Sequence, residues 1–511
     1  MDIRSRLELA GRALFALLDP EHDLLPTGGY EVAHDLGRWW DAVLRLEATV
    51  GWKVPAALES ASTRNLRRLT DNPDCLLMNR PDISWLRDRA RINPHNFRES
   101  ILAFSALRRH RQAGWAERAA LRLVQSMDRC LRDDGSLDFA KLGSWGIAPL
   151  TDDPSHAEAK RNGWFDGTAT SGRSIEALIW LYESTGAAPA LDLAGRLAEH
   201  HFEHTLSPDG TIRPEILDPQ NVGHNHSYHG TLRGLLLYGL ASRRRAFVDA
   251  VAATYRNTRE TLVMESGWAP HDLGIIRFSN AHGDPVADPA SAGDAAQLAL
   301  WLALNAGHDD LLDDVERLVR ARLLPAQMTA SDGEATERET GAWCIHGPSH
   351  GGKGCTPDVL AAVTHSLSDV YRHVCTVTAE LIRVNLHLEY EDALITVRSQ
   401  RDTQGELRVT LRTPADLSLR IPGWVDAASV DVRVDGRASK RRCSGSWMHV
   451  DAEALGDGRE VVMTYALPER STEECMPSGR IYRFRWCGDH IVGVAPQDSP
   501  RPFYPQLGDV S

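Results

Sequence analysis

The sequence lacks the features that mark several classes of protein. No uninterrupted apolar run approaches the roughly 20 residues that cross a bilayer, so we expect no membrane-spanning segment. Eight cysteines among 511 residues are too few for a disulfide-rich scaffold. Positive charge is not in excess either, because 70 acidic residues outnumber 57 lysines and arginines. The formal charge of −13 therefore argues against nucleic acid and anionic membranes as partners.

The N-terminus lacks the clean apolar core of a secretory signal, because charges interrupt the stretch MDIRSRLELAGRALFALLD. We therefore expect a cytoplasmic protein whose thiols are reduced. Whether the chain forms a homo-oligomer is left open, since oligomeric state is not visible in the sequence.

Tryptophan and histidine are abundant by contrast. The chain has 14 Trp against 10 Tyr and 10 Phe, together with 21 His. Apolar residues make up 42% of the sequence, enough for a large core. The indole rings either fill that core or line a groove, where they stack well on sugar rings.

The first three-quarters of the chain reads as consecutive helical hairpins with a repeat of roughly 60 residues. The second helix of each hairpin follows the first after a short break. The predicted pairs are 33–50 with 56–70, 95–111 with 115–132, 170–186 with 188–204, 229–243 with 245–262, and 291–307 with 308–324. A single helix that begins at Pro357 completes a sixth pair with the N-terminal helix of residues 2–18. Six hairpins whose ends meet predict a mainly α fold, an (α/α)6 barrel over residues 1–376.

After Thr376 the pattern changes to alternation with period two, which is typical of strands with one buried face. The alternating segments are 381–388, 393–399, 406–413, 429–436 and 460–465, separated by turn pairs such as Asp435-Gly436. We expect an antiparallel β-sandwich domain over residues 377–511 that packs rigidly on the barrel.

The segments that lead into the first helix of each hairpin are long and rich in Gly, His, Trp and Asp. A ring of hairpins places all six lead-in segments at one mouth, which predicts a pocket there. Each side chain also has a structural interpretation, as a core Trp, a buried His or a helix cap. The predicted substrate-binding residues are Trp164, Asp166, His226, His229, Trp343, His346 and His350.

Carboxylates from separate lead-in segments could supply acid/base chemistry. Cleavage of a glycosidic bond usually needs one protonated and one ionised carboxyl group. The predicted catalytic residues are Asp284, Asp294 and Glu339. Asp294 could equally be a helix cap, and the separation that decides between retention and inversion is not visible in the sequence.

One lead-in segment carries four potential zinc ligands. Cys344, His346, His350 and Cys355 form the pattern C-x-H-x3-H-x4-C, whose spacing matches none of the common zinc modules. Zinc is therefore one hypothesis for this segment, beside the expectation that no cofactor is bound.

The sequence LSLRIPGWVDAASVDVRVDGRA at 417–438 resembles the β-domain pattern L-x-L-R-I-P-x-W of glycoside hydrolase family 127, the β-L-arabinofuranosidases. The segment 354–374 is similar to that family's C-C-P-P-N-x-A-R helix. The resemblance implies an (α/α)6 barrel followed by β-sandwich domains. It also places Asp284 at the acid/base position, Asp294 at a zinc-ligand position and His229 at a histidine that precedes the fourth hairpin.

The same resemblance implies a different mechanism. Ala296 stands where the family has a zinc-binding thiol, and Gly354 stands where it has the cysteine nucleophile, so Cys355 alone is left of the pair. We therefore expect carboxylate chemistry instead of a zinc-bound cysteine nucleophile.

The leading hypothesis is an exo-acting glycoside hydrolase. It would remove a terminal sugar, an arabinofuranoside or a uronic acid, from small oligosaccharides or glycosides, and Arg91 and Arg173 would suit a uronate. One alternative is an (α/α)6 sugar isomerase, epimerase or polysaccharide lyase that uses His and Tyr, for which the sequence NHSYH at 225–229 is suited. The other is a non-catalytic sugar-binding relative.

Overall fold

The computed structural model describes most of the chain. The described residues are 2–26, 28, 32–78, 91–92, 95–138, 141, 148–149, 171–329, 337–352, 354–378, 381–439, 442–455, 460–497 and 501–507. Among them, no helix combines the length and apolar character that crossing a bilayer requires.

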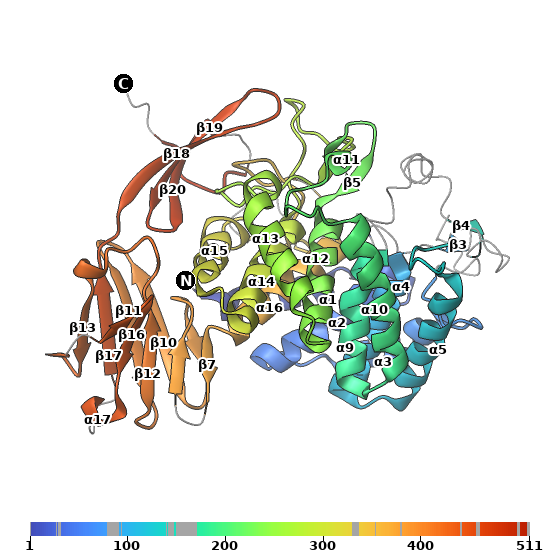
Figure 1. The fold of residues 1–511 in the computed structure, drawn as a ribbon, viewed down its shortest axis with the longest axis horizontal. Coiled ribbons are helices and arrows are strands. Elements are labelled where there is room, and N and C mark those ends of the chain that lie inside the picture. The colour runs from blue at the N-terminus through green and yellow to red at the C-terminus, as the bar shows by residue number, and fades with distance from the viewer. Residues whose placement is uncertain are drawn as a thin grey trace.

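Six inner helices, labelled in the helical part of Figure 1, form a closed ring through their mutual contacts. Each contacts the next one along the chain, and the last contacts the first. They are α2 (Val32–Val50), α4 (His95–Arg111), α9 (Ser171–Thr185), α12 (Asn225–Ala241), α14 (Pro289–Ala306) and α16 (Pro357–Arg372). Each of the six helices comes from a different predicted pair, as an (α/α)6 barrel requires. The predicted barrel is therefore confirmed.

The outer helices pack on the inner ring. They are α1 (Ile3–Ala16), α3 (Ala56–Leu69), α5 (Gly114–Cys130), α10 (Ala188–His204), α13 (Arg245–Leu262) and α15 (Leu312–Leu318). The N-terminal helix α1 packs against α16, as predicted. Outer helices bury one stripe, such as Ala116, Ala120 and Leu123 of α5, whereas α14 is buried over most of its length.

Short elements join the helices. They are β1 (Leu18–Asp19), β2 (Leu25–Pro26), β3 (Arg91–Ile92), β4 (Ala148–Pro149), α11 (Pro214–Leu217), β5 (Val222–His224), β6 (Asp272–Gly274), the 3-10 turns Pro20–His22 and Asp309–Leu311, and the π-helical turn Val319–Leu323. The pairing of β5 with β6 joins the segments that lead into α12 and α14.

Two sheets follow the barrel and form the predicted sandwich. The first has the order β14-β13-β17-β11-β10-β9 and the second the order β15-β16-β12-β8-β7. Their strands are β7 (Cys375–Val377), β8 (Leu381–Val384), β9 (Tyr390–Glu391), β10 (Ile395–Arg401), β11 (Gly405–Leu411), β12 (Asp416–Arg420), β13 (Asp431–Val434), β14 (Arg437–Ala438), β15 (Cys443–Ser444), β16 (Trp447–Val450) and β17 (Glu460–Tyr465). A 3-10 turn (Ala427–Ser429) and the short helix α17 (Ala452–Leu455) lie between them. One pair, β8 with β12, is parallel in this otherwise antiparallel arrangement.

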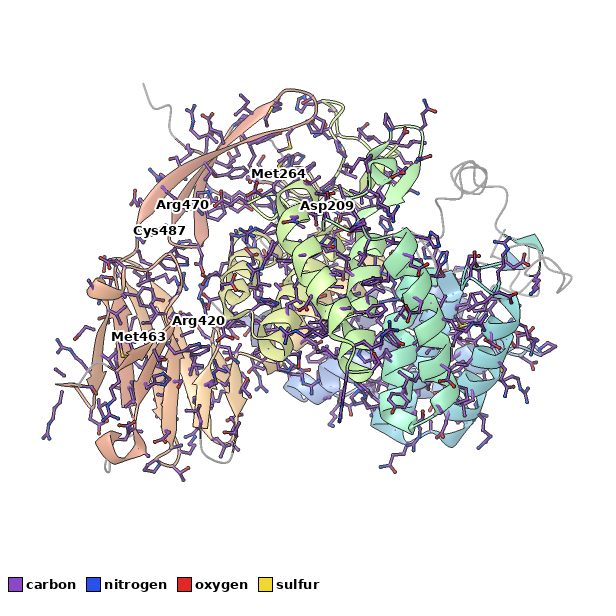
Figure 2. All side chains as sticks on the ribbon, in the orientation of Figure 1. Asp209, Met264, Arg420, Met463, Arg470 and Cys487 are labelled. Carbon is purple, nitrogen blue, oxygen red and sulfur yellow. A yellow bond between two sulfur atoms is a disulfide. The ribbon has the colours of Figure 1, made fainter. Side chains whose placement is uncertain are left out.

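Ion pairs hold the sandwich against the barrel. Arg420 of β12 pairs with Asp313 and lies 2.9 Å from Glu316, both on α15. Figure 2 labels Arg420 on the side of the sandwich that faces the helices. Arg420 of the sandwich and Glu316 of the barrel are thus buried together at the junction of the two domains.

A third sheet was not foreseen as a separate unit. The strands β18 (Glu469–Cys475), β19 (Ile481–Cys487) and β20 (His490–Ala495) form a sheet of their own and arch from the sandwich toward the helices (Figure 1). Their inner face packs Tyr482, Phe484 and Trp486 against Trp268 and Ala287 of the barrel. This apolar cluster explains why apolar and polar residues alternate along the strands, although the strands do not join the sandwich.

Candidate active site

Polar side chains line the axis of the barrel. On α2, Arg38, Asp41 and Arg45 recur every three or four residues, which places them on one face of the helix. The other inner helices contribute in the same way. The ten charged residues of this axial network are Arg38, Asp41, Arg45, Arg98, Glu99, Arg173, Glu176, Arg233, Asp294 and Asp369, each at most 8% exposed. Five arginines thus face five carboxylates.

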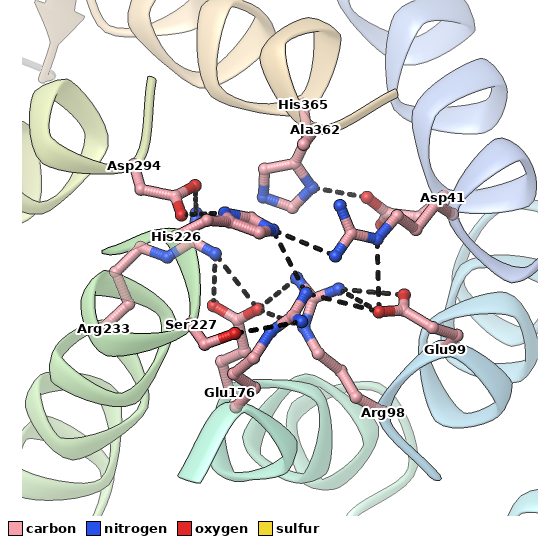
Figure 3. A network of polar contacts seen from close by, with 12 residues as sticks. Asp41, Arg98, Glu99, Glu176, His226, Ser227, Arg233, Asp294, Ala362 and His365 are labelled. Atoms are coloured by element: carbon pink, nitrogen blue, oxygen red, sulfur yellow. Dashed lines mark hydrogen bonds and ion pairs between the residues drawn. The ribbon is translucent and has the colours of Figure 1, made fainter. Parts of the chain in front are cut away.

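Ion pairs connect the axial network across the ring (Figure 3). Arg98 of α4 lies 2.9 Å from Glu99 and also binds Glu176 of α9. Arg233 of α12 lies 3.0 Å from Glu176 and 2.8 Å from Asp294 of α14. Buried charges are tolerated only when paired in this way, so the network fixes the inner helices in register.

His226 of α12 lies at the centre of the axial network. Its Nε2 is 2.9 Å from Arg38 and 3.1 Å from Arg173. Since guanidinium groups can only donate, Nε2 accepts, and Nδ1 carries the proton that it donates to Asp294. Burial and the nearby Arg173 and Arg38 hold the pKa of His226 well below its usual range. The imidazole is therefore neutral and its tautomer is fixed.

Asp294 is a carboxyl group whose protonation is unusual for neutral pH. Burial raises the pKa of Asp294 to about 7, although Arg233 acts in the opposite direction, and Glu176 adds to the rise. A carboxyl group with this pKa can both hold and release a proton near neutrality, which is the property of a general acid or base.

The cavity that the described residues enclose on the axis is too small for a sugar. The cavity among Arg38, His226, Asp294 and His365 has a volume of about 10 Å³, which is the space for one water molecule. A ligand the size of a sugar would need the wider space nearer the N-terminal ends of the inner helices, at the mouth.

Histidines connect the axial network to the mouth. The ring of His224 lies 5.7 Å from that of His226 and 4.5 Å from that of His271. The Nε2 of His224 is 3.6 Å from Asp288 Oδ2, at the start of α14. Phe278, which is 50% exposed, meets His271 edge to face with the ring centroids 5.1 Å apart. This wall of the mouth presents imidazoles, a carboxylate and an exposed aromatic ring.

The structure brings two of the predicted site residues, His226 and Asp294, into direct contact. The other predicted carboxylates have different partners. Asp284 is fully buried and accepts a hydrogen bond of 2.8 Å from the backbone of Ser478, in the turn between β18 and β19. Glu339 accepts one of 3.3 Å from the backbone of Cys355. Their catalytic roles stay predictions.

The segment that leads into α16 is packed as core. Trp343 is fully buried, and its Nε1 donates to the carbonyl of Leu323 at 2.6 Å. The prediction that Trp343 forms a sugar platform is therefore wrong, because its ring has no exposed face. His346 is 2% exposed, and its ring lies 5.0 Å from that of Phe503. His350 forms a backbone bridge with Pro502 of the C-terminal segment.

Cys344 and Cys355 are joined by a disulfide, contrary to the expectation of reduced thiols. Bridged sulfurs carry no thiolate, so the zinc hypothesis for Cys344, His346, His350 and Cys355 requires reduction of this bond. The zinc site of the resembling family does not fit either. Asp294 is already paired with Arg233 and His226, and Ala296 and Gly354 offer no sulfur.

Three further residues, His229, Trp164 and Asp166, were predicted to bind substrate. His229 is 2% exposed and donates from Nδ1 to the carbonyl of Asn225, and burial lowers its pKa to about 4. Its role in substrate binding stays a prediction. Trp164 and Asp166 lie outside the described residues.

Sequence reasoning missed most of the axial network, together with His271 and Asp288. A signal was present, because charged residues at spacings of three and four interrupt inner helices that are otherwise apolar, as Arg38, Asp41 and Arg45 do. Arg173 was considered as a partner for a uronate, but it is 2% exposed and lies 3.4 Å from Glu99.

Comparisons with known proteins support the fold. No family profile matches the sequence, and no curated protein matches it. The structure is similar to that of a β-arabinofuranosidase of glycoside hydrolase family 127, at 15% identity and a TM-score of 0.61, covering 95% of this chain and 79% of that one.

Two further solved structures show the same likeness. A β-L-arabinofuranosidase of that family from Geobacillus stearothermophilus T6 is 14% identical, with a TM-score of 0.56 and coverage of 96% of this chain and 80% of that one. A glycoside hydrolase is 13% identical, with a TM-score of 0.54 and coverage of 90% and 77%. The resemblance seen in the sequence is therefore confirmed as a likeness of fold to family 127 enzymes.

Proposed function

We propose that this protein is a glycoside hydrolase that removes a terminal sugar at the mouth of the barrel, with Asp294 as its acid/base group. The observation that carries the proposal is the pair of Asp294 and His226 on the barrel axis, in which burial raises the pKa of Asp294 to about 7. The similarity in fold to arabinofuranosidases supports the choice of a sugar as substrate.

The axial network supplies the chemistry in this proposal. Asp294 holds a proton for the leaving oxygen, and in this proposal a water molecule in the cavity that Asp294 lines with His226 passes the proton on toward the mouth. Arg233 and His226 stabilise the carboxylate once the proton has left. Asp284 is the candidate for the second carboxyl group in this proposal, and Glu339 has no part in it.

Asp294→Asn tests the assignment. Loss of a positioned acid/base group lowers kcat by about 10²–10⁴-fold. The matched control is Asp310→Asn, which removes an exposed carboxylate that pairs with Arg256 on the surface. A panel of chromogenic glycosides that includes arabinofuranosides and uronides, assayed with and without chelator, identifies the sugar. Full turnover by Asp294→Asn would refute the role, and sugar binding without turnover across the panel would favour a binding protein.

The pH dependence gives an independent check. A general acid must be protonated, so kcat/KM should fall about tenfold per pH unit above a pKa near 7. The residual activity of Asp294→Asn should lack this decrease at high pH. A wild-type profile that is flat between pH 6 and 8, about one unit on either side, would contradict the assignment.

A second function has its own supporting observation. His226 is neutral, is backed by Asp294 and faces two arginines, an arrangement that also suits proton transfer at carbon in a sugar isomerase or epimerase. Incubation of free sugars in deuterium oxide distinguishes the two. Deuterium in a product carbon without hydrolysis favours isomerisation, whereas release of an aglycone without label favours hydrolysis.

A further inference from the structure

Three side chains in the mouth direct potential metal ligands toward one another. His224 ends β5, His271 immediately precedes β6, and Asp288 caps the N-terminus of α14. The ligand atoms of the three residues all lie within 4.8 Å of one another. In the described part of the chain, no other group of three or more His, Cys, Asp or Glu side chains has ligand atoms this close together.

Backbone hydrogen bonds hold the three segments together. The amide of His271 donates to Val286 at 2.8 Å, and the amide of Asp288 donates to Ala269 at 3.0 Å. The amide of Asn225, next to His224, donates to His271 at 3.1 Å. The positions of the three ligand-bearing residues are therefore fixed by main chain, without the help of an ion.

Each histidine has its Nδ1 engaged by a partner. His224 Nδ1 lies 3.0 Å from Ser227 Oγ, and His271 Nδ1 lies 2.9 Å from Asp272 Oδ1. Asp272 is held in turn by the guanidinium of Arg277 at 2.7 Å. A second partner of this kind orients the imidazole in metal sites and leaves Nε2 for the ion.

The free ring nitrogen of His224 has no other explanation in the described structure. His224 Nε2 is buried without a hydrogen-bond partner there, although Asp288 Oδ2 lies 3.6 Å away. Buried polar nitrogens are normally hydrogen-bonded, so an unpaired one that points at a carboxylate requires an account. A cation between the two groups would satisfy both.

We propose that His224, His271 and Asp288 bind a divalent transition-metal ion of the zinc class at the mouth of the barrel. Zinc bonds of about 2.0–2.1 Å in a tetrahedron set the ligand atoms roughly 3.3 Å apart, so small rotations of the rings from their present positions suffice. Three protein ligands leave a coordination position open, the pattern of catalytic rather than structural zinc. The side chains of His224 and His271 are 19% and 13% exposed, so that position is accessible from the mouth.

The ion would add water activation or binding of a sugar hydroxyl to the chemistry of the mouth. The proposal does not rest on the glycosidase assignment, because the metal is measured directly. It also differs from the zinc hypothesis for Cys344 and Cys355, since its ligands contain no sulfur.

Titration of metal-free protein with Co²⁺ and then Zn²⁺ tests the site. We expect one tight equivalent, visible as the d–d absorption of Co²⁺ and displaced by Zn²⁺. Asp288→Asn, which retains an oxygen for the helix cap, and His271→Gln should each weaken binding at least tenfold. The matched control, His282→Ala, removes an exposed histidine of the same segment and should bind as the wild type does.

Three results would overturn the proposal. They are absence of a stoichiometric ion, unchanged affinity in both ligand variants, and a thiolate-to-cobalt charge-transfer band that places the ion on cysteine. Far-ultraviolet circular dichroism of each variant shows whether weaker binding comes from loss of fold. Because metal content and absorption are the readouts, failure of the glycosidase assignment leaves this test unaffected.

Discussion

Two walls of the barrel mouth have similar compositions and different structures. The segments that lead into α12 and α14 carry His224, His226, His271 and Asp288, whose side chains point toward one another or toward the axial network. The segment that leads into α16 is also rich in His and in addition carries two cysteines, but its Trp343 is buried in the core.

The difference arises from what covers each wall. Residues 501–507 lie across the α16 segment, where Gly351 donates a backbone hydrogen bond to Arg501 and Phe503 donates one to Ser349. No comparable cover of His224 or His271 is present among the described residues, and both remain partly exposed. We therefore call the wall with His224, His271 and Asp288 the open wall, and the segment that leads into α16 the covered wall. The chemical type of a residue therefore indicates a site only where the rest of the chain leaves it accessible.

The largest expected effect concerns the axial network behind the open wall. Arg233→Met leaves Glu176 and Asp294 buried without their shared cation. Removal of one partner from such a pair costs about 3–5 kcal/mol, so the free energy of unfolding in urea should fall by that amount. The exposed pair of Arg245 and Asp249 is the control, and Arg245→Met should cost less than about 1 kcal/mol. Equal losses in the two variants would show that the network does not stabilise the fold.

Trp343→Ala probes the covered wall. Removal of a buried indole costs about 3–5 kcal/mol, and as a core residue Trp343 should leave KM within about twofold. Thermal unfolding and steady-state kinetics measure the two quantities. A large rise in KM with an unchanged melting temperature would restore Trp343 as a sugar platform.

Acid should weaken the axial network, because one of its carboxylates, Asp369, must gain a proton. Burial alone would raise the pKa of Asp369, but Arg45 at 2.9 Å lowers it to about 2. Its ionised form thus contributes stability that is complete above the unfolded pKa of about 4 and lost as the pH falls toward 2. Between pH 5 and 2 the wild type should lose about 2 kcal/mol more than Asp369→Asn, measured by urea unfolding. An equal acid response of the two proteins would contradict the lowered pKa.

Phe278→Ala should have the smallest effect. The ring is half exposed beside His271, so its loss should change stability by less than about 0.5 kcal/mol. If a sugar stacks on the open wall, KM should rise several-fold with kcat unchanged. An unchanged KM would place the sugar elsewhere in the mouth.

The sequence predicted the architecture better than the site. Helical periodicity and Pro357 were enough to define the ring, because each inner helix is specified by its own residues. The packing of the third sheet on the barrel and the cover of the α16 segment come from contacts between residues 150 or more positions apart, such as Gly351 with Arg501. No local pattern encodes such contacts, and for that reason Trp343 was misassigned.

Within the site, His226 and Asp294 were predicted from local chemistry, but their partners were not. Arg38, His271 and Asp288 each have an ordinary surface or capping interpretation in the sequence. Only the closure of the ring places Arg38 2.9 Å from His226, and only the pairing of β5 with β6 places His271 beside His224.

The most direct test compares one carboxyl group from each wall. Asp294→Asn removes the carboxylate on the axis behind the open wall, and Glu339→Gln removes a half-buried one from the covered wall. With the sugar identified by the glycoside panel, kcat/KM of Asp294→Asn should fall at least 10²-fold, and that of Glu339→Gln should stay within about threefold. A profound loss in Glu339→Gln with little change in Asp294→Asn would place the chemistry on the covered wall and contradict this account.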